Sequence, residues 1–147
     1  MALLRTVDAP PRSWRSVVVL AACVVVAVAP YLAGVLIPYY VNDLDALPLA
    51  EVASGAHDPK DLWPQGTLGG LAQLGGLLSL SLTPIVLLAV GGISAAAAVQ
   101  EWHTLPVARR APRPVAVACV VVTLVCVALL AWFFTPTASA LMTWRMD

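Results

Sequence analysis

The residues best suited to chemistry lie between positions 38 and 67, in a polar stretch that separates two apolar runs. It contains five carboxylates and one imidazole, namely Asp43, Asp45, Glu51, His57, Asp58 and Asp61. Such carboxylates could bind a hard cation or, with a raised pKa, transfer protons. Their spacing matches neither the EF-hand pattern nor H-E-x-x-H. The sequence therefore favours a solvated acidic loop over a metal site or a membrane-enzyme site.

A second set of residues is suited to contact between helices. Small side chains recur at four-residue spacing from Gly66 onward, beginning with a G-x-x-x-G motif that ends at Gly70. In lipid, small residues allow helix backbones to approach closely, and that approach drives helix association. We therefore expect helix packing or partner contact at Gly70, Gly75, Gly76, Ser79, Thr83, Gly91, Gly92 and Ala96.

The composition places both sets of residues in a membrane protein. Of the 147 residues, 61% are hydrophobic and 11% are charged, and the mean hydropathy is +0.89. Soluble domains contain about 45–50% apolar and about 25% charged residues. These values exclude a disordered protein, a nucleic-acid-binding protein and an ordinary cytosolic enzyme. The first partner that they imply is the lipid bilayer.

Three apolar runs are long enough to cross a bilayer, which requires about 20 residues. They cover residues 16–37, 74–99 and 115–134, and none contains Asp, Glu, Lys, Arg or His. Residues 38–67 would form a 30-residue outer loop and residues 100–114 an inner loop. The sequence thus predicts an all-α integral membrane protein, with one membrane domain over residues 1–147 and three transmembrane helices.

The distribution of basic residues predicts the orientation. Six arginines fall at the amino terminus and in the inner loop, whereas Lys60 and Arg145 fall on the other side. Since basic residues in short loops favour the cytoplasm, the amino terminus should be cytoplasmic and the carboxyl terminus outside. The Arg, Ala and Val usage indicates a GC-rich genome, so we expect a bacterial plasma membrane. Several aromatic residues should mark the outer interface: Tyr31, Tyr39, Tyr40, Trp63, Trp132 and Trp144.

Three further local features can be expected from the sequence. Pro30 and Pro84 should kink the first two spans, because proline removes a backbone donor. The region Pro48–Ser54 could form a short helix that ends near Gly55. The cysteines, at positions 23, 119 and 126, lie in apolar runs and should act as small packing residues.

The remaining functional expectation follows from the motifs that the sequence lacks. The spans contain no ionisable residue, and the chain has no phosphate-binding loop, nucleophile elbow or Rossmann motif. We therefore expect no cofactor, no metal and no catalysis. The favoured function is an accessory or scaffolding subunit that docks onto a larger membrane complex. The alternatives are a membrane enzyme that uses the acidic loop and a homo-oligomeric carrier or pore lined by Gln73, Ser79, Ser81 and Thr83.

Overall fold

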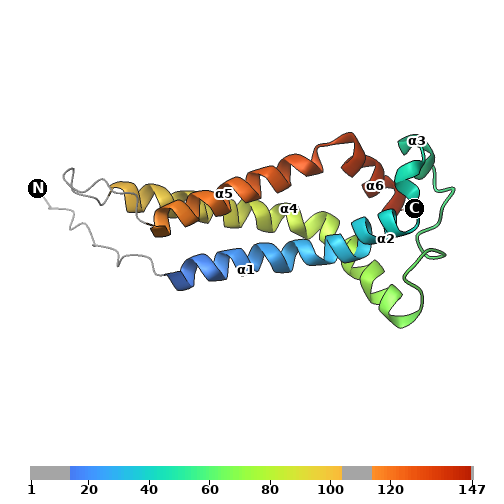
Figure 1. Ribbon diagram of the computed structural model, residues 1–147, viewed down its shortest axis with the longest axis horizontal. Helices are drawn as coiled ribbons and strands as arrows, with labels where there is room; N and C mark the ends of the chain where they lie inside the picture. The colour runs from blue at the N-terminus through green and yellow to red at the C-terminus, as the bar shows by residue number, and fades with distance from the viewer. Residues whose placement is uncertain (1–13, 104–113, 147) are drawn as a thin grey trace, which may run out of the picture.

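The computed structural model describes residues 14–103 and 114–146, and these residues form helices and no strands. Three long helical segments run side by side as an elongated bundle (Figure 1). They are α1 (Trp14–Tyr31), which continues through η1 (Leu32–Leu36) and α2 (Ile37–Val41), then α4 (Gly66–His103) and α5 (Pro114–Phe133). All three segments are long and apolar enough to cross a membrane. The all-helical class and the three candidate spans are therefore confirmed. Most of the arginines that predict the orientation lie outside the described residues.

The first two helices extend further than the apolar runs that predicted them. The first continues to Val41 and the second begins at Gly66, so that the outer loop is shorter at both ends than residues 38–67. The third ends at Phe133, one residue before the expected end at 134. The early start of α4 has a tertiary cause, because Gly69 lies against the Pro64 carbonyl and the Gln73 side chain donates to the Pro59 carbonyl at 3.1 Å.

The two prolines within the candidate spans have different consequences. Shortly after Pro30 the backbone widens into the π-helical turn η1, where the Ile37 N–H donates to the Leu32 carbonyl. In contrast, α4 continues as one helix through Pro84. Helices commonly accommodate an irregularity by a single π turn. The first span thus remains unbroken through its proline.

The backbones of α4 and the first span touch at a pair of glycines. A Cβ atom on Gly34 would lie 2.6 Å from the Gly76 Cα, and one on Gly76 would lie 2.9 Å from the Gly34 carbonyl carbon. Both residues are buried, so the two backbones are in direct contact. This contact sets the spacing of the two helices near the end of the bundle where α2 ends and α4 begins, which we call the outer end after the predicted orientation.

The third helix packs on α4 through small residues. Cys119 and Cys126 of α5 are fully buried, and a Cβ on Gly91 of α4 would lie 3.2 Å from the Cys126 Cβ. The packing role expected of the cysteines is therefore confirmed at these two positions. Cys23 is not in the core of the bundle, since it is exposed on α1.

A compact cap closes the outer end of the bundle. It comprises η2 (Leu44–Ala46), α3 (Leu49–Val52) and α6 (Pro136–Met146), which follows a short turn after α5 and packs against α3. The expected short helix near Pro48 is thus present as α3, and Gly55 beyond it has a φ of 72°. The sequence analysis did not anticipate α6.

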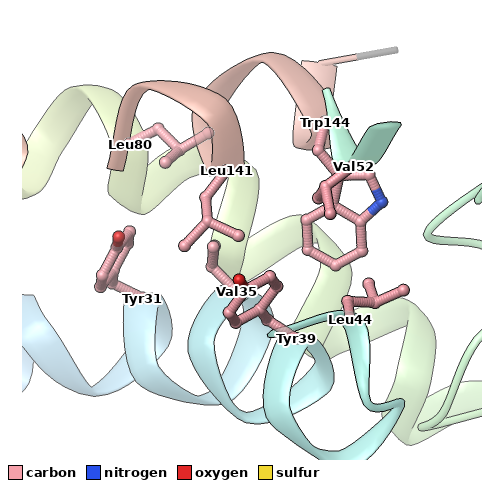
Figure 2. Close-up of a cluster of buried hydrophobic side chains, with 8 residues drawn as sticks. All are labelled: Tyr31, Val35, Tyr39, Leu44, Val52, Leu80, Leu141 and Trp144. Atoms are coloured by element: carbon pink, nitrogen blue, oxygen red, sulfur yellow. The ribbon is translucent and has the colours of Figure 1, made fainter. Parts of the chain in front are cut away.

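Figure 2 shows the core of this cap. Trp144 and Leu141 of α6 meet Val52 of α3 and the Tyr39 ring from α2. The Trp144 indole is fully buried and donates to the His57 carbonyl at 2.7 Å. Deeper in the bundle, the Trp132 indole donates to the Tyr31 hydroxyl at 3.1 Å. Of the aromatic residues expected at the outer interface, Tyr31, Tyr39 and Trp144 are core residues, whereas Tyr40 and Trp63 are exposed.

The glycine contact predicts a selective loss of stability. Gly34→Ala should destabilise the bundle by about 1–3 kcal/mol, the usual cost of overpacking, since its methyl group would meet the backbone of α4. Thermal unfolding in detergent measures the loss. Gly92→Ala is the control, because nothing lies within 4 Å of its added Cβ. Equal stability of the two variants would contradict the backbone contact.

The hydrogen bond from the Trp144 indole to the loop gives a second prediction, on the stability of the cap and on cleavage of the loop. Trp144→Phe removes the donor to the His57 carbonyl and shrinks a fully buried side chain, so it should cost more than the about 1 kcal/mol of the hydrogen bond alone. Because this bond holds the loop, cleavage by a lysine-specific protease at Lys60, the only lysine in the sequence, should become faster. Trp63→Phe is the control, because the Trp63 side chain is 52% exposed. Unchanged cleavage in Trp144→Phe would show that the loop is held by other contacts.

Candidate functional site

A groove of about 600 Å³ runs between α1 and α4 at the depth of the apolar spans. Small residues from both helices line it, including Ala22 and Ala27 on α1 and Gly75 on α4. Leu78 and Leu82 add larger apolar walls, and no charged residue takes part. The lining of this groove is almost wholly apolar.

The groove opens on the side of α1 that faces away from α5. Val17 and Val24 of α1 are buried in clusters that contain Cys119 and Cys126 of α5. Residues of the groove, such as Ala22, lie on the opposite side of α1, since successive residues rotate by about 100° around a helix. The third helix therefore leaves the groove open.

Two hydroxyls at the base of the groove form hydrogen bonds to the backbone. The Thr83 hydroxyl donates to the Ala27 carbonyl of α1 at 2.7 Å. The Ser79 hydroxyl donates to the Gly76 carbonyl of its own helix at 2.6 Å. Thr83 thus links the two helices directly, close to the glycine contact.

The residues expected to form contacts on α4 fall into two groups. Gly76, Ser79, Thr83 and Gly91 are buried within the bundle, although Ser79 and Thr83 also line the groove. Gly70, Gly92 and Ala96 are exposed, and Gly75 is half-buried in the wall of the groove. Some small residues of α4 therefore make contacts within the chain, whereas others remain accessible on its surface.

The four residues expected to line a pore do not share one surface. Ser79 and Thr83 both line the groove. Gln73 lies at the outer loop, where its side chain donates to Pro59, and Ser81 is exposed on another face of α4. A single copy of the chain thus brings together only two of the four.

The acidic loop does not gather its carboxylates. Among residues 14–103 and 114–146, no group of three His, Cys, Asp or Glu side chains could hold a metal ion. The His57 Nε2 lies 3.4 Å from the Glu51 Oε1 at the surface. Asp58 accepts the Lys60 backbone N–H at 2.9 Å, and this bond, with the Lys60 charge, lowers the pKa of the Asp58 carboxyl. Asp43, Asp45 and Asp61 are exposed.

Sequence reasoning missed the α1 side of the groove. Ala22, Ala27 and Gly34 were not among the expected contact residues, although Ala27 accepts the bond from Thr83 and Gly34 meets Gly76. A signal was present, since Cys23 and Ala27, and Pro30 and Gly34, repeat the four-residue spacing of small side chains. Searching the first span for this pattern would have identified the groove's other wall.

Comparisons with family profiles, with curated proteins and with solved structures gave no match to this chain. Its function is therefore inferred from its own surfaces.

The hydrogen bond across the groove gives a prediction on stability. Thr83→Val keeps the shape of the side chain but removes the donor to Ala27, so it should cost about 0.6 kcal/mol, the average for such bonds in membranes. Unfolding in mixed detergent and sodium dodecyl sulfate measures the cost. Ser81→Ala removes an exposed hydroxyl of the same helix and should be neutral. Equal losses in the two variants would show that the interhelical bond does not contribute.

Proposed function

We propose that this protein is a non-catalytic accessory or scaffolding subunit of a larger complex in a bacterial plasma membrane. A transmembrane helix of the partner would occupy the groove between α1 and α4. The observation that carries this proposal is the groove itself, an apolar concavity of about 600 Å³ that the chain's own third helix leaves open.

The lining of the groove favours a helix as its occupant. Helices associate in lipid through close backbone contact over small residues, and Ala22, Ala27 and Gly75 provide such a surface. A Cβ on Gly75 would lie 3.5 Å from the Pro30 Cβ, an ordinary contact distance. The fold of the chain would therefore allow a side chain at Gly75. Its absence leaves room for a neighbour.

The outer cap offers a second contact region. Short helices and a long connection pack into one buried core around Trp144, which gives the cap a defined surface. In the orientation that the arginines favour, this cap lies outside the cytoplasm. A partner with both a transmembrane helix and an outer domain would contact the groove and the cap together.

The groove's polar groups favour docking over transport. The hydroxyls of Ser79 and Thr83 each donate to a backbone carbonyl, and the rest of the groove is apolar. A water-filled path needs polar groups that face the water. We therefore keep the oligomeric pore as the alternative, and single cysteines at Ser79 and Thr83 test it, since aqueous thiol reagents would modify them only in a pore.

Site-specific photo-crosslinking tests the docking proposal. A photoreactive residue at Ala22, in the groove, should crosslink to one partner that also co-purifies stoichiometrically in gentle detergent. The same residue at Val127, on the exposed face of α5, is the matched control and should give only lipid adducts. Crosslinks from Ala22 to a second copy of this chain would instead support the homo-oligomer.

Filling the groove should release the partner. Gly75→Leu places a branched side chain beside Pro30 and should reduce the co-purified partner by about tenfold, equal to about 1.4 kcal/mol of binding energy. Gly92→Leu adds the same side chain on an exposed face and should retain the partner. Release by Gly92→Leu but not by Gly75→Leu would place the contact on the other face of α4 and contradict docking in the groove.

A further inference from the structure

A second pocket, of about 320 Å³, lies at the outer end of the bundle between three separate parts of the chain. The loop contributes Asp58 and Lys60, α4 contributes Leu74 and Leu77, and α6 contributes Arg145. This pocket differs from the groove in its residues and in having charged side chains. It does not belong to the docking site proposed above.

The pocket gathers the two basic residues expected on the outer side. Lys60 and Arg145 are far apart in the sequence, yet both line this one cavity together with Asp58. The Lys60 Nζ lies 3.5 Å from the Asp58 Oδ2, and Lys60 is well exposed. Arg145 is half-buried, and this burial lowers its pKa while the Asp58 charge raises it. With two cations and one carboxylate, the pocket has one unbalanced positive charge.

The wall on α4 is apolar and open. The side chains of Leu74 and Leu77 are 59% and 45% exposed, respectively. Gly70, one turn before Leu74, adds no side chain, and nothing lies within 4 Å of the position its Cβ would take. An apolar strip thus begins directly beneath the charged rim, which is the arrangement expected of a site for an amphiphile with an anionic head.

The pocket lies at the edge of the apolar run of α4. This run covers residues 74–99, about 39 Å at about 1.5 Å per residue, which is enough to cross a bilayer core of about 30 Å. Leu74 and Leu77 stand at the outer boundary of this section. Lys60 and Arg145 lie beyond it, in the cap, where a phosphate group would be found.

The charged rim is held in place by the fold. The Trp144 indole binds the His57 carbonyl, next to Asp58, and the Gln73 amide binds the Pro59 carbonyl. The Gln65 amide donates to the Lys60 carbonyl at 3.2 Å. Side chains from α4, α6 and the end of the loop therefore fix both flanks of the segment that contains Asp58 and Lys60. The pocket is formed before any ligand arrives.

We propose that this pocket binds a phospholipid, with its phosphodiester against Lys60 and Arg145 and an acyl chain along Leu74 and Leu77. One negative charge on the phosphodiester balances the one unbalanced positive charge of the rim. Basic residues that flank an apolar helix surface are the general means by which membrane proteins hold anionic headgroups. The site adds a lipid partner to a protein whose protein partner docks elsewhere.

Native mass spectrometry of the full-length protein in detergent tests the proposal, with phosphatidylglycerol as the probe. One lipid should remain bound. Lys60→Gln should weaken binding by about fivefold, equivalent to about 1 kcal/mol for one basic residue near a charged surface. Because Lys60 is exposed, this variant keeps the fold, which an unchanged melting temperature confirms. Asp58→Asn should strengthen binding, since it removes the opposing charge from the rim.

A matched pair of variants tests the apolar wall. Leu77→Trp should obstruct the pocket and reduce lipid occupancy, whereas Leu71→Trp, on an exposed face outside the pocket, should not. Glycerol phosphate, which carries the head chemistry without a chain, should fail to displace the lipid. The proposal is overturned if Lys60→Gln and Asp58→Asn leave binding unchanged, if the two tryptophan variants behave alike, or if glycerol phosphate competes as well as the lipid.

Discussion

The arrangement of the bundle depends on one backbone contact, that of Gly34 with Gly76. Helices in lipid gain no hydrophobic energy by meeting, so the distance between α1 and α4 is set by how closely their backbones can approach. At this point neither residue has a side chain, and both are buried. The Thr83 hydroxyl, which binds the Ala27 carbonyl, adds a directional bond about two turns deeper.

The same contact explains why the groove and the pocket are separate sites. Most of the groove lies on the inner side of this contact, among residues such as Ala22, Ala27 and Leu82. Beyond the contact, α4 continues alone toward Gly66, as Figure 1 shows, and the outer loop packs on it. The pocket with Lys60 and Arg145 forms on this extension. One surface is therefore wholly apolar, and the other has a charged rim.

Most of the membrane architecture could be predicted from the sequence, because long apolar runs without charge have few alternatives to a transmembrane helix. The ends of the helices could not, since the start of α4 depends on contacts that Gln73 and Gly69 make with the loop. Helix α6 was missed because it is mixed in composition, and its burial depends on Leu141 and Trp144 meeting α3. Small residues of α4 were expected at helix contacts, and the structure buries Gly76 and Gly91 but leaves Gly92 exposed. The sequence could not assign each of these residues to a neighbour in the chain or to open space.

The π turn after Pro30 changes which way the following residues point. In a regular α-helix, positions four apart drift by about 40° around the axis, so a stripe with that spacing winds away from its partner. A π turn holds more residues per rotation and cancels part of this drift. Tyr31, Val35 and Tyr39, four residues apart, accordingly all face inward with 4% exposure or less. The irregularity keeps a single seam of side chains aligned from the candidate span into the core of the cap.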